Sequence, residues 1–424
     1  MKTITTLIAA SSLLAALAVA QPPRYTVKDL GAVGGPPGQP YFITNNGLVS
    51  GAAAMPDGTM HFALWYNGLK MDIGTPGLGG QNSAAFGVNV RGQAVGEAET
   101  SDPNGEDFCG FSALGLPTSG TACLPFLWQN GVMAKLPTLG GANGVANMIN
   151  NRGQVAGFAE NKTQDQGCPV LQFKPVIWEN GGIHELPTYP GDADGAAIGI
   201  NDNGQVVGVS GPCAAFNPNL GLHLLDSHAL LWQDGTVTDL GNLGGDGGFG
   251  GNHACAINNQ GHVVGHSDLT GDTTFHAYLW TRETGMRDLG TLPGDFASLA
   301  IGINDRGEVV GGSLDVNFNI RASLWQNGAM TDLNTLIPAN SGLYLLLAQS
   351  INSSGEVIGI AVEKSSGHVH GFLATPRNGG AGSESFSPAA QSVTSPMALS
   401  EDARKLLQQR LRLGRFGAGL TGQR

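Results

Sequence analysis

The chain has 424 residues, of which 13% are charged and 66 are glycine, and it carries 33 acidic residues against 21 lysines and arginines. The excess of negative charge lies between residues 21 and 376, where 30 acidic residues stand against 13 basic ones, a net charge of −17. A body this acidic repels phosphate groups, which argues against nucleic acid and anionic lipid as its partners.

The first twenty residues have the order of a secretory signal peptide. Lys2 gives a basic start, an apolar run follows, and Ala18-Val19-Ala20 supplies the small residues expected before a cleavage site. A membrane anchor is the alternative, but the run is rich in Ala, Ser and Thr, and no later stretch is apolar over the ~20 residues that a spanning helix needs. We therefore expect residues 1–20 to be removed, and the protein to be secreted, periplasmic or extracellular, without a transmembrane anchor.

One sequence unit recurs seven times after the signal peptide. Its turn glycine falls at Gly47, Gly92, Gly153, Gly204, Gly261, Gly307 and Gly355. A second landmark follows each glycine at Trp65, Trp128, Trp178, Trp232, Trp280, Trp325 and Ala374. A third landmark, Asp-Leu-Gly or a variant of it, also occurs seven times. A period of about 40–50 residues is typical of propeller blades.

The turns within each unit predict four strands. The Asn-x-x-Gly turn at residues 150–153 and the Asn180-Gly181 turn both join apolar runs, and Asn-Gly is a strong hairpin signal. The first strand of each unit is rich in small residues, which predicts that it lies nearest the axis. No helical pattern occurs between Tyr25 and Pro376. We therefore expect an all-β fold, a seven-bladed β-propeller of four-stranded blades.

The order of the landmarks also predicts how the ring closes. Residues 25–31 (YTVKDLG) read as an outer strand with no first three strands before it, and the last unit has three strands with no outer strand after it. The first strand can complete the last blade, which protects the sheet edges. The propeller domain is thus expected at residues 21–376.

The recurrent tryptophans and histidines have structural and functional interpretations. A tryptophan needed in every blade favours packing between blades over stacking on a sugar. Histidines stand four residues before the tryptophan position at His61, His228, His276 and His370. Equivalent positions in different blades diverge around the ring, so we expect hydrogen bonds to neighbouring loops and not a shared metal site.

Three units carry inserts between their second and third strands. We place these inserts at Glu97–Leu124, Phe158–Lys174 and Val209–Ser227. They should emerge on one face of the ring and form a raised rim, and long loops on a rigid scaffold are frequent binding sites. The acidic cluster Asp102, Glu106 and Asp107 provides weak candidate binding residues, and it reads more naturally as a solvated loop.

Cysteines and acidic turns suggest further sites. We expect disulfides Cys109–Cys123 and Cys168–Cys213, because export permits them. Cys255 reads as a buried free thiol; a catalytic role would require a base and access. Asp192 and Asp194 could help to bind calcium, but the full loop pattern is missing, so an acidic turn is the preferred interpretation. No cofactor is expected.

The chain ends in a region of different composition. Residues 377–399 are rich in Gly, Ser, Ala and Pro and read as a flexible linker. Residues 400–424 read as a basic helical tail, with Ser400 as its cap and two acidic residues in its first turn. The tail could dock on the acidic propeller, on a membrane or on a partner, or remain a solvated end.

The amino-acid sequence of the repeated units resembles the HAF family of extracellular repeats found in exported bacterial proteins. The resemblance rests on "DLGTLPGDFASLAIGINDRGEVVGGS" and "TFHAYLWTRETGMRDLG" and extends from Tyr25 to about Pro376, although several units lack the His-Ala-Phe of the family name. It implies export and a repeat architecture, and no defined activity or ligand.

Two classes of function are compatible with these features. We favour an exported, monomeric, non-catalytic scaffold that binds an unknown extracellular glycan or protein through its insert-bearing face. The alternative is a carbohydrate-active propeller enzyme, a lyase or glycoside hydrolase, which would need acidic residues that converge near the axis.

Overall fold

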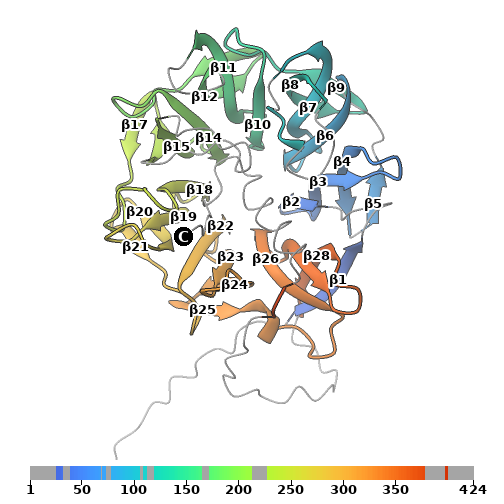
Figure 1. Ribbon diagram of the computed structural model, residues 1–424, viewed down its shortest axis with the longest axis vertical. Coiled ribbons are helices and arrows are strands. Elements are labelled where there is room, and N and C mark those ends of the chain that lie inside the picture. Colours follow the sequence, from blue (N-terminus) through green and yellow to red (C-terminus); the bar gives the residue numbers. More distant parts are fainter. Residues whose placement is uncertain are drawn as a thin grey trace, which may run out of the picture.

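The computed structural model describes residues 25–31, 39–67, 69–72, 78–105, 108–111, 119–164, 171–212, 227–377 and 397–399. Within these ranges the chain forms seven antiparallel four-stranded sheets, arranged as a ring around a central axis (Figure 1). The protein is therefore a seven-bladed β-propeller, as the repeats predict. One short 3₁₀ turn, η2 (Leu333–Thr335), follows the sixth blade.

The first three blades take their strands in chain order, from the inner strand to the outer one. Blade 1 consists of β2 (Gln39–Ile43), β3 (Leu48–Ala54), β4 (Met60–Tyr66) and β5 (Leu69–Asp72). Blade 2 consists of β6 (Gly79–Val88), β7 (Ala94–Pro103), β8 (Thr121–Gln129) and β9 (Val132–Lys135). Blade 3 consists of β10 (Gly144–Ile149), β11 (Val155–Gln164), β12 (Leu171–Glu179) and β13 (Gly182–Glu185).

The next three blades repeat this order. Blade 4 consists of β14 (Asp194–Ile200), β15 (Val206–Gly211), β16 (His228–Gln233) and β17 (Thr236–Asp239). Blade 5 consists of β18 (His253–Ile257), β19 (Val263–Asp268), β20 (Phe275–Thr281) and β21 (Gly285–Asp288). Blade 6 consists of β22 (Ala297–Ile303), β23 (Val309–Leu314), β24 (Ile320–Gln326) and β25 (Ala329–Asp332).

The start of the chain completes the seventh blade. This blade consists of β26 (Leu343–Ile351), β27 (Val357–Glu363), β28 (Val369–Pro376) and, as its outer strand, β1 (Tyr25–Gly31). In the antiparallel β1–β28 pair, Tyr25 lies opposite Pro376 and Asp29 lies opposite Phe372. The predicted closure of the ring is confirmed.

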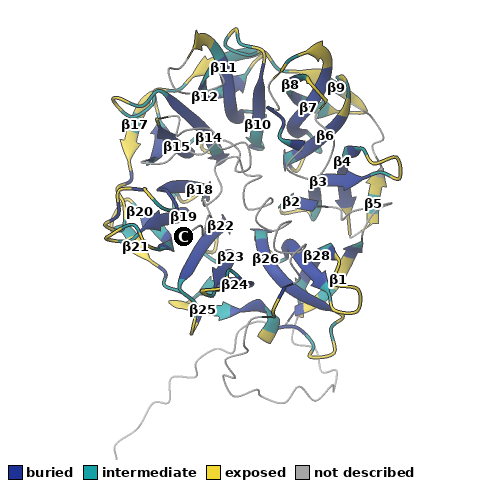
Figure 2. Cartoon of the chain, in the orientation of Figure 1, coloured by how far each residue is buried: buried dark blue, intermediate teal, exposed yellow. Residues whose placement is uncertain are grey.

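The Asn-Gly turns at the outer edge have the predicted backbone. Asn130, Asn180 and Asn327 adopt φ values of 51–52°, and the glycine that follows each also has positive φ. Two successive positive φ angles define the type I′ turn that joins the third and fourth strands of a blade. Exposed residues gather at these outer hairpins, whereas the inner strands are mostly buried (Figure 2).

A glycine in the second strand of each blade, which ends a Val-Val-Gly sequence in blades 4 to 6, is required where that strand crosses a bulge in the first strand. A Cβ on Gly311 would lie 1.9 Å from the carbonyl oxygen of Leu299, so no side chain fits there. The same contact recurs at 1.8–2.1 Å in the other blades, at Gly51, Gly96, Gly157, Gly208, Gly265 and Gly359. The inner-strand register shifts at this point in every blade, which marks a conserved bulge geometry around the ring.

The tryptophans pack between blades, as predicted. Trp178 and Trp232 are buried, and each donates from Nε1, at 2.7 Å, to a backbone carbonyl in the loop that follows the preceding blade, Pro137 and Pro187 respectively. In blade 7 the equivalent residue, Ala374, lies opposite Val357 and is also buried. The tryptophans are thus used for packing and are not displayed as a sugar-stacking surface.

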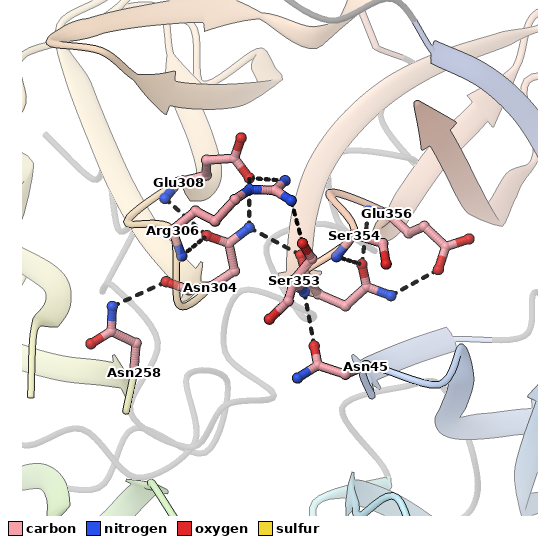
Figure 3. Close-up of polar contacts among 9 residues, drawn as sticks. Asn45, Asn258, Asn304, Arg306, Glu308, Ser353, Ser354 and Glu356 are labelled. Carbon is pink, nitrogen blue, oxygen red and sulfur yellow. Dashed lines mark hydrogen bonds and ion pairs between the residues drawn. The ribbon is translucent and has the colours of Figure 1, made fainter. Parts of the chain in front are cut away.

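A belt of asparagine side chains joins the blades at the Asn-x-x-Gly turns. Its members are Asn89, Asn150, Asn201, Asn258, Asn304 and Asn352. Each donates from Nδ2, at 2.9–3.1 Å, to the backbone carbonyl of the corresponding residue in the next blade. Blade 1 has Thr44 at this position, and Asn46 instead donates to the carbonyl of Val90 at 3.2 Å. Figure 3 shows the part of the belt that runs from Asn258 to blade 7.

Candidate functional site

The inserts are shorter than the sequence suggests. In blade 2, Glu97 lies opposite Pro125 and Glu99 lies opposite Cys123, so both ends of the stretch Glu97–Leu124 belong to the strand ladder. The ladders of blades 3 and 4 likewise include the first residues of their predicted inserts. The predicted boundaries are wrong because the extra residues first prolong the antiparallel pairing, which satisfies their backbone groups. The insert proper of blade 2 comprises residues 104–120.

Two aromatic residues and a disulfide hold the insert of blade 2 on the propeller. Phe108 and Phe111 are 3% and 2% exposed and belong to one apolar cluster with Phe158. The Phe108 and Phe158 ring centroids lie 6.0 Å apart. The predicted disulfide Cys109–Cys123 is confirmed and links the insert to β8. The middle of this insert is therefore fixed to the blade.

The other predicted residues of the inserts are only partly described. Asp102 is exposed near the end of β7, while Glu106 and Asp107 lie outside the described residues. Cys168 and Cys213 also lie outside them, so their disulfide remains a prediction. The binding role of the acidic cluster likewise remains a prediction.

The carboxylates of Asp192 and Asp194 are engaged by protein groups. Asp192 accepts a hydrogen bond from the Ser210 hydroxyl at 2.5 Å and lies 3.0 Å from His228 Nδ1, and Asp194 accepts from the backbone N–H of Phe173 at 2.9 Å. Neither belongs to a group of potential metal ligands among the described residues; the group found there is Glu97, Cys109 and Cys123, in which both cysteines are disulfide-bonded. A calcium site at Asp192 and Asp194 therefore remains a prediction.

The recurrent histidines bond to nearby polar side chains; the predicted loop partner is found for His228, whereas His276 and His370 bond to outer strands. His276 Nδ1 lies 3.0 Å from Asp288, and His370 Nδ1 lies 2.8 Å from Asp29, in each case on the outer strand of the same blade. His228 instead reaches Asp192 in the loop before its blade. In blade 6, Arg321 takes this position and bonds to both Asp295 and Asp332. These contacts fasten the outer strands and loops to the blades.

The axis of the ring contains a cavity of about 350 Å³. Its wall includes the bulge residue of every inner strand, namely Tyr41, Phe86, Asn147, Ile198, Cys255, Ile301 and Gln349. The expectation that small residues line the axis holds for the neighbouring alanines and glycines but not for these positions. Because the bulge adds an unpaired residue to each strand, it turns a larger side chain towards the axis.

The recurring landmarks of the sequence do not reveal these cavity residues. The seven blades share their turns, glycines and tryptophans but differ at the bulge, which is aromatic in blades 1 and 2, aliphatic in blades 4 and 6, and an amide in blades 3 and 7. The signal in the sequence is a variable position inside an otherwise repeated motif. A cavity with different walls on different sides can recognise a ligand in one orientation.

One end of the cavity is bordered by the residues that follow the asparagine belt. This ring includes Asn45, Asn151, Asp202, Asn259 and Asp305, all exposed or half-exposed. The side chains bond from blade to blade: Asp202 accepts from the backbone N–H of Asn151 at 2.8 Å, and Asp305 accepts from that of Asn259 at 2.9 Å. The cavity mouth is thus polar, held in place by its own hydrogen bonds, and carries two carboxylates.

Cys255 has a possible base beside it that the sequence did not reveal. Its sulfur lies 4.0 Å from Nδ1 of His266, and both residues line the cavity. Cys255 keeps some exposure, yet desolvation raises its thiol pKa to about 12. Burial also lowers the pKa of His266 to about 4, against the opposite effect of its bond to the Gly250 carbonyl. Near pH 7 both groups are neutral, so this pair does not generate a thiolate nucleophile.

The C-terminal part of the chain contributes a short segment to the described structure. Leu399 is buried, and Met397 and Leu399 pack against blades 6 and 7. The backbone N–H of Met397 donates to the hydroxyl of Tyr344 at 3.1 Å. The rest of the predicted linker beyond Arg377, and the predicted basic tail, lie outside the described residues.

Comparison with known proteins finds solved structures of low similarity. No family profile matches the chain, and no curated protein matches it. Solved structures similar to it include a TolB-like protein from Agrobacterium tumefaciens, 12% identical, with a TM-score of 0.33 over 57% of this chain and 88% of that one. AofleA from Arthrobotrys oligospora is 10% identical, with a TM-score of 0.33 over 73% of this chain and 85% of that one. Similarity at this level carries no inference about function.

The described part of the chain contains no helix that could span a membrane. None of the helical structure there has the length and apolar character needed to cross a bilayer.

Proposed function

We propose that the protein is an exported, non-catalytic binding scaffold that recognises an extracellular glycan or protein through the insert-bearing face of the propeller. The observation that carries this proposal is the anchoring of the blade 2 insert, in which Phe108 and Phe111 are buried and Cys109 is bonded to Cys123. A segment held in place before binding, as Phe108 to Phe111 are, loses less conformational entropy when a partner binds. The disulfide also agrees with an oxidising, extracytoplasmic location.

The surface beside this anchor is suited to hydrogen bonding. The β7–β8 hairpin exposes Ser101 and Asp102, and the β11–β12 hairpin exposes Lys162 and Thr163. Both hairpins have longer strands than those of blades 4 to 6, so they extend the rim of this face. Hydroxyl, carboxylate and ammonium groups on a fixed rim can bind a glycan or a polar protein surface.

A glycan array combined with a sugar-release assay tests the proposal. We expect the purified full chain to retain at least one glycan, or a protein partner captured by cross-linking, without releasing sugar. The double variant Asp102→Ala/Lys162→Ala should weaken that binding. Val316→Ala, at an exposed turn on the same face of blade 6, should leave it unchanged. Catalytic release of sugar would support the enzyme alternative, and binding unaffected by the rim variant would remove the rim from the site.

A further inference from the structure

The axial cavity has features of a ligand site that is separate from the insert-bearing rim. Its mouth lies at the Asn-x-x-Gly turns, and in an antiparallel blade these turns lie at the end opposite to the loops between the second and third strands. Its volume of about 350 Å³ is near the lower end of the range for small-molecule pockets, roughly 300–1,000 Å³. The cavity therefore has room for a small ligand and not for a polymer.

The wall of the cavity is mainly apolar. Tyr41, Phe86, Ile198 and Ile301 contribute aromatic and aliphatic surface from four blades. The polar groups of the wall are mostly paired within the protein: the Tyr41 hydroxyl donates to Gln39 at 2.8 Å, and Asn147 Nδ2 donates to the carbonyl of Ala197 at 2.8 Å. A ligand would meet a surface that favours an apolar body.

Gln349 is different, because its side-chain oxygen has no partner. Among the described residues, Gln349 Oε1 is buried and accepts no hydrogen bond, and the residue lines the cavity at the bulge of β26. A buried acceptor that is left unpaired carries a free-energy cost, because it has lost its hydrogen bonds to water. A ligand that brings an N–H or O–H group to this atom would recover that cost.

The mouth also limits the charge of the ligand. Asp202 and Asp305 stand in the ring at the mouth, and each already accepts hydrogen bonds through both oxygens from the asparagine of the preceding blade. Their negative charge, together with that of the buried Glu97 in the wall, repels anions. The mainly apolar wall and the neutral amide of Gln349 favour an uncharged molecule.

From these observations we propose that the axial cavity binds a small, uncharged, mainly aromatic or alicyclic molecule that donates one hydrogen bond to Gln349. The apolar bulge residues bury the body of the ligand, and Gln349 fixes its orientation. This site is independent of the proposed function of the rim.

Indole and indene provide a matched pair of probes, because they have similar fused rings and only indole has an N–H donor. Binding of each to the full chain is measured by ligand-detected NMR titration. We expect indole to bind about five- to tenfold more tightly than indene, the effect of one hydrogen bond in a buried site. Gln349→Leu should abolish this preference while indene still binds. Gln326→Leu, the same substitution on β24, should preserve it.

A second variant tests the location. Ile301→Phe adds volume to the wall and should weaken the binding of both probes, whereas Asp102→Ala on the rim should change neither. Failure of both probes to bind the folded native chain would overturn the proposal. Equal binding of indole and indene, or an indole preference that survives Gln349→Leu, would overturn it as well. Because the rim variants are read separately with glycans and protein partners, this result and that of the proposed function are distinguishable.

Discussion

Asn352 donates a hydrogen bond from Nδ2 to the backbone carbonyl of Thr44, 3.1 Å away, although 308 residues separate them in the chain. The bond joins the inner strand of the last blade to that of the first. Together with the β1–β28 pairing at the outer edge, this bond means that the ring is closed at two places, one near the axis and one at the periphery. The stability of the propeller should therefore depend strongly on residues at this joint.

Removal of the closing strand should destabilise the propeller far more than removal of the tail. A chain that starts at residue 32 loses β1 and the buried side chains of Tyr25 and Leu30. We expect its melting temperature to fall by about 10 °C or more, because several kcal/mol of apolar burial and strand pairing are lost. A chain that ends at residue 399 is the control and should melt like the full chain. Equal melting of the two truncations in a calorimetric scan would contradict the role of β1.

Substitution of a belt asparagine should strongly lower the stability of the fold. Asn352→Ala removes an amide that makes four hydrogen bonds. The amide donates to Thr44 and Glu356, and it accepts from the backbone N–H groups of Ser354 and Glu356. Buried groups left without partners cost about 1–3 kcal/mol each, so we expect a loss of at least about 2 kcal/mol in urea unfolding. Asn340→Ala, at an exposed position, should change stability by less than about 0.5 kcal/mol.

The Val-Val-Gly glycine should tolerate no side chain. In Gly311→Ala, the new Cβ would meet the carbonyl oxygen of Leu299 at 1.9 Å, so the strands must separate. We expect a loss of about 3 kcal/mol or failure to fold, at the upper end of the cost of overpacking. Gly342→Ala provides the control, because nothing lies within 4 Å of its added Cβ. A stable Gly311→Ala protein would show that the bulge can relax.

The buried His266 should make the protein less stable in acid. Its pKa is lowered from 6.5 to about 4, chiefly by burial, so the unfolded chain takes up a proton between these values that the folded chain does not. This contribution is absent above about pH 6.5 and destabilises the fold progressively as the pH falls, by about 2 kcal/mol at pH 5. Urea unfolding at pH 7 and pH 5 should show a smaller difference for His266→Gln than for the native chain. His184→Gln, at an exposed histidine, should keep the native difference.

The disulfide of the blade 2 insert should stabilise the fold measurably. The double variant Cys109→Ala/Cys123→Ala opens a loop of 14 residues and should lose about 3 kcal/mol in denaturant unfolding. Treating that variant with a reductant tests the other predicted bridge. A further loss of stability would indicate the disulfide Cys168–Cys213, and no further loss would argue against it. Native-state thiol titration of the untreated chain should find Cys255 slow to react, given its raised pKa of about 12.

Much of the scaffold could be predicted because its signals are local and repeated. An Asn-Gly pair such as Asn180-Gly181 specifies a type I′ turn through its own backbone preferences, and seven copies of each landmark set the number of blades. Tyr25–Gly31 reads as an outer strand without three strands before it. It predicted closure of the ring because the last blade lacks an outer strand. The boundaries of the blade 2 insert could not be read in this way, since the pairing of Glu99 with Cys123 depends on a partner 24 residues away.

The sequence by itself therefore determined the all-β architecture, the blade count, the closing strand and the pairing of Cys109 with Cys123. Only the tertiary structure decided what meets at the axis. Tyr41, Cys255 and Gln349 are far apart in the chain and share no motif, and they line one cavity because seven bulges occur at the same height in the ring. The proximity of His266 to Cys255 and the unpaired oxygen of Gln349 follow from that convergence, because burial and hydrogen-bond partners are set by neighbours in space and not by neighbours in sequence.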